Sequence, residues 1–145
     1  MLKFRYLPHT ADAKFVSYGK TFRKALENSA LALLSLMVDV NSASRVRCEP
    51  SSILISESAD SEAELVWFTL QDILSKVDTH NLSAYAFRVV SLKMPRQGRM
   101  RLQGRLIHKR TSGNFALMSV KAVTPHDLTV RRSKGKVSIW VVVDV

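Results

Sequence analysis

The residues whose types could do chemistry are few in this chain, and the most suggestive are acidic residues near its two ends. Asp12 closes the polar cluster 9–12 (His-Thr-Ala-Asp), where an N-terminal strand should pass to the next one. Asp144 directly follows the apolar run 139–143. A hard cation such as calcium takes carboxylate and carbonyl oxygens, so Asp12, Asp144 and the terminal carboxylate of Val145 could form one site. Spacing alone favours a simpler interpretation, in which Asp12 caps a turn and Asp144 ends a strand in water.

A second feature is Lys121, a cation within the otherwise apolar stretch 120–123. Side chains alternate along a strand, so Lys121 could point to solvent, or it could face a carboxylate or a phosphate. A zinc enzyme built on dispersed histidines is a remote alternative, because no histidine has a partner at helical metal spacing. Glycine-rich phosphate loops, Cys/His zinc spacings and nucleophile elbows are absent from the sequence. The histidines are His9, His80, His108 and His126.

Two helices are predicted among the elements that must position these groups. Thr21 is a plausible N-cap, and the apolar residues after it recur at helical spacing to about Met37. Ser61 with Glu64 three residues later has the form of a capping box, and a second helical pattern follows it. The apolar positions are Phe22, Ala25, Leu26, Ala30, Leu33, Leu34 and Met37 in the first helix, and Val66, Leu70, Ile73, Leu74 and Val77 in the second.

The rest of the chain shows the period-two alternation of strands. A pair of strands is expected around Pro50, the first carrying Val46 and Cys48. From Ala84 onward the alternation marks strands near 85–89, 100–106, 115–117, 120–122, 128–130 and 137–143. Turns are expected near 95–98, 111–113, 124–126 and 133–135. The order of predicted strands and helices along the chain predicts an α+β fold, with two helices packed on a sheet, in a single domain over residues 1–145.

Charge is distributed unevenly along this chain of net charge +10. Residues 1–85 hold nine Lys or Arg and ten Asp or Glu, whereas residues 86–136 hold thirteen Lys or Arg and only Asp127 as an acid. Such a block favours a polyanion such as RNA, or an acidic protein surface, as partner; a basic surface that only contacts water is the alternative. Cys48 is the only cysteine, and neither a secretory signal nor a membrane-spanning run is visible, so a reducing, cytoplasmic location is expected.

Several segments, taken in order along the whole chain, resemble the archease family. Residues 6–12 (Tyr-Leu-Pro-His-Thr-Ala-Asp) resemble its opening motif. The other matching segments are 18–22 (Tyr-Gly-Lys-Thr-Phe) with Ala25 and Asn28, 36–39 (Leu-Met-Val-Asp), 120–126 (Val-Lys-Ala-Val-Thr-Pro-His) and 143–145 (Val-Asp-Val). The resemblance implies an α+β, archease-like two-layer fold, with two helices packed on an antiparallel or mixed sheet.

The resemblance also implies a function. Archease proteins are accessory factors rather than enzymes: they activate the RtcB-type RNA ligase, which joins tRNA halves in tRNA splicing. They promote the guanylylated state of that ligase and its multiple turnover, and they bind calcium. Carried over to this chain, the metal ligands are Asp12, Asp144 and Val145. Lys121 is the candidate for contact with the ligase, and the remaining partner-binding candidates are His9, Asp39 and His126.

The matching motifs also contain departures from the family pattern. Pro8 stands where an acidic residue is frequent, and Pro125 replaces a tyrosine. Lys14 places a positive charge close to Asp12. Two alternative interpretations follow from the basic block and from these departures: an RNA-binding module that acts without the ligase through residues 86–136, and an archease paralogue that has lost metal binding.

Overall fold

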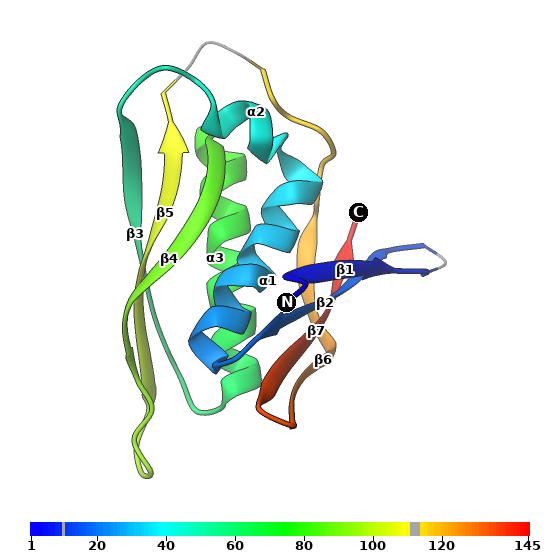
Figure 1. Cartoon of the computed structure of the whole chain (residues 1–145), viewed down its shortest axis with the longest axis vertical. Helices are drawn as coiled ribbons and strands as arrows, with labels where there is room; N and C mark the ends of the chain where they lie inside the picture. The colour runs from blue at the N-terminus through cyan, green and yellow to red at the C-terminus, as the bar shows by residue number, and fades with distance from the viewer. Residues whose placement is uncertain (10, 111–113) are drawn as a thin grey trace.

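Two antiparallel sheets enclose the helices of this chain, as the computed structural model in Figure 1 shows. The structure describes residues 1–9, 11–110 and 114–145. The four-stranded sheet has the order β1-β2-β7-β6 and the three-stranded sheet the order β3-β5-β4. The elements along the chain are β1 (Phe4–Leu7), β2 (Ala13–Gly19), α1 (Phe22–Met37), α2 (Val40–Ser44), β3 (Pro50–Ala59), α3 (Glu62–His80), β4 (Ser83–Lys93), β5 (Met100–Lys109), β6 (Ala122–Ser133) and β7 (Lys136–Asp144).

Helix α1 lies between the two sheets and contacts strands of both. The Thr21 side chain caps it by accepting a hydrogen bond from the main-chain N–H of Lys24, as predicted. The Asn28 side chain donates to the Tyr18 carbonyl of β2 at 2.7 Å, and the Glu27 carboxylate accepts from the Val89 N–H of β4 at 2.8 Å. One helix therefore joins the two sheets through its polar side chains as well as through its apolar face.

Helix α3 packs beside α1 and also contacts both sheets. Its capping residue is Ser61, whose hydroxyl accepts from the Glu64 N–H at 3.2 Å. The Glu64 carboxylate accepts in return from the Asp60 N–H at 3.1 Å, one residue before the position that a standard capping box would use. At its other end, Asn81 adopts the left-handed conformation that terminates many helices.

The α+β class and both predicted helices are confirmed, and the helices lie between two sheets rather than on a single one. A short helix, α2, was not predicted; five residues are too few to establish a periodicity. In the part of the chain that the structure describes, no helix is long and apolar enough to cross a membrane.

Three predicted strand features are wrong. Residues 46–48 form a bend, so the pair of strands around Pro50 is the single strand β3. The segment 115–117 contributes one isolated bridge, between Val38 and Ala116, rather than a strand. The turn expected at 124–126 is an irregularity within β6, where the register to β7 shifts between Thr124 and Thr129. The predicted turn at 111–113 lies outside the described residues.

Candidate metal centre

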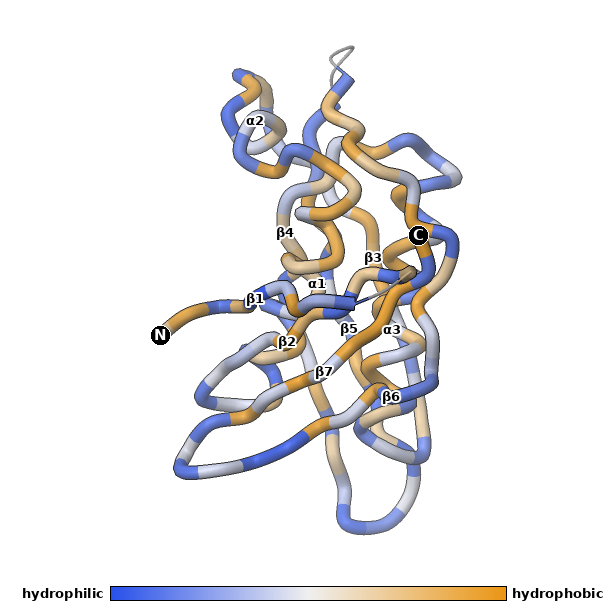
Figure 2. The backbone as a smooth tube through the Cα atoms, turned by 90° about the vertical axis from the view of Figure 1, so that its right-hand side faces the viewer, coloured by the Kyte–Doolittle hydropathy of each residue, from blue (hydrophilic) through white to orange (hydrophobic). Residues whose placement is uncertain are grey.

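The pairing of β2 with β7 brings the two ends of the sequence together. This antiparallel ladder ends at the pair Ala13 and Val143. Asp12 precedes that pair on one strand and Asp144 follows it on the other, so both acids lie beside the same pair of residues. The β1–β2 hairpin and the C-terminal end of β7 lie side by side in both views (Figures 1 and 2).

Burial of apolar side chains fixes this end of the sheet. Phe15 of β2 and Val141 and Val143 of β7 are fully buried against the helices, and the C-terminal half of β7 is hydrophobic in Figure 2. Val145 is half-buried and packs against the same core. Because the neighbouring apolar residues are anchored, the main chain on either side of the two acids is held in place.

Strand β6 completes the candidate centre. The Lys121 N–H donates to the Asp144 carbonyl at 2.7 Å, and Ala122 pairs with Asp144 in the ladder. Helix α3 holds the next residue, Val123, from the other side. The Gln71 side chain accepts from the Val123 N–H at 2.9 Å, and the Trp67 indole donates to the Val123 carbonyl at 2.8 Å. Nothing in the sequence indicates the hydrogen bond that Trp67 makes.

The electrostatics of the centre suit a hard cation. None of the ion pairs found among residues 1–9, 11–110 and 114–145 involves Asp12 or Asp144. Two carboxylates at adjacent strand ends repel each other, and a divalent cation between them would remove that repulsion. The Lys14 ammonium lies 5.9 Å from the centre of the Trp140 ring, on the face of the sheet that Trp140 occupies.

The donors available to a metal are oxygens. Within the described residues, no three His, Cys, Asp or Glu side chains are grouped so that they could hold a metal ion. The candidate set is therefore two carboxylates, Asp12 and Asp144, with the main-chain oxygen of Val145, which calcium would have to complete with further carbonyls or water. This all-oxygen set fits calcium and does not fit zinc, which favours nitrogen and sulfur ligands.

Three of the four partner-binding candidates lie on the four-stranded sheet or in its loops. His9 is exposed in the loop that follows β1, and Lys121 is exposed just before β6. His126 is exposed in the irregular part of β6, with its Nε2 3.5 Å from the Asp127 carboxylate. Lys121 is thus next to Asp144 in the fold, whereas His126 is further along the edge strand.

Asp39 has a structural role that the sequence did not reveal. It is the N-cap of α2, and its carboxylate accepts from the main-chain N–H of Ser42 at 3.2 Å and from the Ser42 hydroxyl at 2.7 Å. These hydrogen bonds lower the pKa of Asp39. The Asp39 N–H donates to the Phe115 carbonyl at 2.8 Å. An acidic residue with a serine three positions later was the available signal for this cap.

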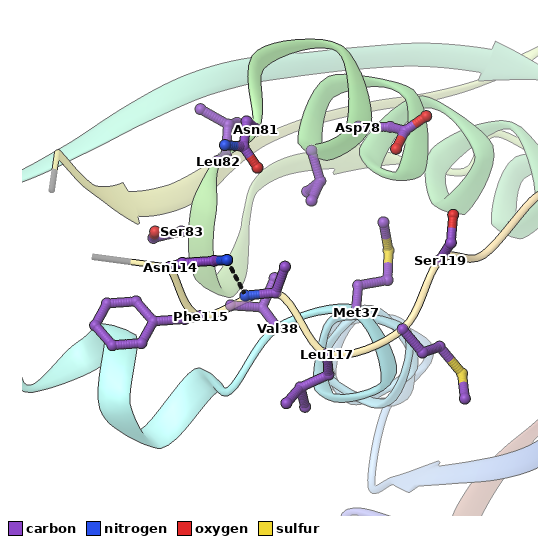
Figure 3. Close-up of a pocket in the computed structure, with 13 residues that line it drawn as sticks. Met37, Val38, Asp78, Asn81, Leu82, Ser83, Asn114, Phe115, Leu117 and Ser119 are labelled. Atoms are coloured by element: carbon purple, nitrogen blue, oxygen red, sulfur yellow. Dashed lines mark hydrogen bonds between the residues drawn. The ribbon is translucent and has the colours of Figure 1, made fainter. Parts of the chain in front are cut away.

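A pocket of about 550 Å³ opens between the end of α3 and the segment 114–119 (Figure 3). The Asn114 side chain accepts from the Ala116 N–H at 3.1 Å and shapes the start of this segment. Leu117 and Met118 are 62% and 45% exposed, which is unusual for large apolar side chains. This segment leads directly into Lys121, so exposed apolar side chains and the candidate ligase contact are neighbours in the chain.

Comparison with known proteins finds similarity to archease proteins over nearly the whole chain. The model of the Archease protein family matches residues 4–145. The archease of Methanosarcina mazei is 29% identical over 99% of this chain and 96% of its own length. That of Ictalurus punctatus is 30% identical over 99% of this chain and 85% of its own length.

Solved structures share the fold. The solution structure of protein 1598 of Methanobacterium thermoautotrophicum has a TM-score of 0.81 at 23% identity, covering 99% of both chains. An archease of Thermotoga maritima, described as a possible chaperone, has a TM-score of 0.57 at 18% identity, covering 96% of this chain and 94% of its own. The family model spans nearly the whole sequence, and this chain therefore belongs to the archease protein family.

Proposed function

We propose that this chain is a calcium-binding accessory protein that activates an RtcB-type RNA ligase in tRNA splicing, in the cytoplasm. It would promote guanylylation of the ligase and its multiple turnover without catalysing a reaction itself. The observation that carries this proposal is the β2–β7 pairing, which in a member of the archease family brings Asp12 and Asp144 to one sheet end.

The residues that would hold the metal are Asp12, Asp144 and Val145. Calcium would neutralise the negative charges of the two neighbouring carboxylates. The β1–β2 hairpin would then be tied to the end of β7 at a position where β2 and β7 no longer pair with each other. The main contribution of the protein is to fix the two acids through nearby buried residues, Phe15 on β2 and Val143 on β7.

The surface around this centre supplies a docking face for the ligase. Lys121 is exposed beside Asp144, and the exposed apolar residues Leu117 and Met118 precede it. Exposed apolar patches rimmed by polar residues are typical of protein interaction sites. Activation requires that the chain bind the guanylylation-competent state of the ligase more tightly than its other states, because a partner shifts an equilibrium only by its differential affinity.

The test is multiple-turnover ligation of tRNA halves by the cognate ligase, with and without this protein. Asp12→Asn and Asp144→Asn should each reduce the stimulation at least about tenfold, since each removes a charged ligand. Glu49→Gln, which neutralises an exposed carboxylate just before β3, is the matched control and should stimulate normally. Full stimulation by Asp12→Asn would contradict the role of the metal centre.

Calorimetric titration with calcium separates this proposal from a family member that has lost metal binding. Saturable binding with one site per chain, absent in Asp144→Asn, is the expected result. If the protein stimulates the ligase but binds no calcium, the proposed docking face would still stand, and the proposed metal site would be wrong.

A second candidate function is contact with RNA through the basic block 86–136. Its support is the exposure of this block: most of its cations lie on strands and turns at the surface. The structure divides these cations between the two sheets, so the two groups can be tested separately. RNA binding in the absence of the ligase, weakening steeply with salt, would favour this function.

A further inference from the structure

The outer face of the three-stranded sheet is open and basic. The helices cover only its inner face, and no other described element covers the outer one (Figure 1). On β5, buried Leu102, Gly104 and Leu106 alternate with exposed Arg101 and Arg105. The neighbouring strands present exposed residues in the same way. The exposed residues of these neighbours are Ser52, Leu54, Ser56 and Ser58 on β3, and Arg88, Val90 and Lys93 on β4.

Cations on this face stand directly opposite other cations. The register pairs Arg88 with Arg105 and Lys93 with Arg101. Like charges in directly opposed positions destabilise a sheet. The three strands contain one acid, Glu57, and its carboxyl meets Asp72 of α3 at the inner face. The facing cations are therefore left without a carboxylate on their own face.

A groove crosses the same face. It has a volume of about 430 Å³ and runs over paired residues of all three strands. A second hollow of about 560 Å³, at the β4–β5 hairpin, shares Lys93 and Arg101 with it. The two hollows therefore form one path from the sheet to the hairpin tip. The residues that line the groove are Ser56, Glu57, Ser58, Ser91, Lys93, Arg101, Leu102 and Gln103. Glu57 and the buried Leu102 are paired in the register and belong to the inner face of the sheet, so the other six supply the polar side chains of the outer face.

We propose that this face, the outer surface of β3-β5-β4, binds the sugar-phosphate backbone of RNA. Two cations, three hydroxyls and an amide in one groove suit phosphate oxygens and 2′-hydroxyls. Exposed side chains two residues apart on a strand are separated by roughly 6.8 Å, comparable with the distance between consecutive phosphates. An RNA strand would also neutralise the facing cations, since the exposed outer positions of the three strands carry no carboxylate.

Several features favour RNA over an acidic protein surface. The exposed apolar residues on the face, Leu54 and Val90, are separated by β5 and form no aromatic anchor of the kind that dominates protein interfaces. The exposed outer positions of the three strands carry no aromatic residue for base stacking. Binding should therefore be sequence-independent and dominated by phosphate contacts. This inference rests on the proposed RNA contact of the basic block and is independent of ligase activation.

The experiment measures fluorescence anisotropy of a labelled 20-nucleotide single-stranded RNA of mixed sequence, with the protein alone and without ligase or calcium. Four phosphate contacts by Arg88, Lys93, Arg101 and Arg105 predict a slope of log K against log[salt] of about −3. The double variant Arg88→Gln/Arg101→Gln should bind about tenfold more weakly, with the slope reduced in magnitude by about 1.4.

The control is Arg131→Gln/Lys134→Gln, which removes the same charge from the same basic block but from β6 and the β6–β7 turn of the other sheet. It should bind RNA within about twofold of the parent protein. Equal weakening by both double variants would overturn the proposal, because net charge alone would then account for binding. Parent-like RNA binding by Arg88→Gln/Arg101→Gln, with loss of ligase stimulation, would also overturn it and assign the face to protein contact.

Thermal unfolding distinguishes a loss of RNA contacts from a loss of protein stability. Arg88→Gln/Arg101→Gln removes one cation from each facing pair, so the melting temperature should stay the same or rise. A fall in melting temperature together with weaker RNA binding would indicate a structural role for these arginines and would count against the proposal.

Discussion

At the scale of single residues, Glu57 has a carboxyl whose pKa is strongly shifted by its surroundings. Burial and the neighbouring Asp72 carboxylate raise its pKa to about 7, and Lys76 only partly offsets them. Its ordinary value is 4.5. The folded state therefore holds this proton more tightly than the unfolded state. Stability should fall as the pH rises from about 4.5 to 7 and then level off.

Glu57→Gln removes this titration. At pH 8 the variant should be more stable than the parent by on the order of 1 kcal/mol, a figure reduced because the carboxyl is partly exposed to solvent. At pH 4 the two proteins should be equally stable, since both are then neutral at this position. Urea unfolding at the two pH values measures the difference. Equal stability at pH 8 would show that Glu57 is not strained by its neighbours.

The sequence predicts the roles of some single residues and not of others. Asp12 and Asp144 were singled out by type and position, and the resemblance to archease gave them a shared role. Their juxtaposition depends on a strand pairing between the two ends of the chain, which spacing cannot show. The cap formed by Asp39 was missed because a five-residue helix has too little periodicity to be noticed.

At the scale of elements, helix α3 holds the edge strand β6 through the two side chains that bond Val123. Trp67→Phe keeps an aromatic ring and removes the indole donor, leaving the Val123 carbonyl with one partner fewer. The expected loss of stability is about 1 kcal/mol. Hydrogen exchange should also be faster in β6 near Val123, because the strand start is less firmly held.

Trp140→Phe is the matched control. The Trp140 indole nitrogen is buried and has no hydrogen-bond partner among the described residues, so the same substitution there removes no hydrogen bond. Its effect on unfolding in urea should be smaller than that of Trp67→Phe. If the two substitutions cost the same, ring size rather than the bond to β6 would explain the loss.

Elements were predictable where their signals are local. The two long helices carry caps and a 3.6-residue period that sequence alone displays, and both were placed correctly. Val46 and Cys48 were wrongly assigned to a strand because two apolar residues separated by one polar residue fit a turn equally well. The segment 115–117 alternates as a strand would, yet its main chain bonds to the end of α1 and the start of α2 instead of joining a sheet.

At the scale of the whole molecule, the fold closes where β2 meets β7. These strands lie at opposite ends of the sequence, and their pairing completes the four-stranded sheet. Such non-local contacts carry a large loop-closure entropy, which packing must offset. The proposed calcium would act at this closing contact, so its effect should appear in the stability of the entire domain and not only in ligation.

Saturating calcium should therefore raise the melting temperature of this chain. A cation at 100 times its dissociation constant stabilises the folded state by about 2.7 kcal/mol if it does not bind the unfolded chain. For a domain of this size that corresponds to roughly 5–10 °C. Asp144→Asn should abolish the shift, whereas Glu49→Gln should retain it. An unchanged melting temperature in millimolar calcium would remove the metal from the closing contact, because a ligand bound only to the folded state must stabilise it.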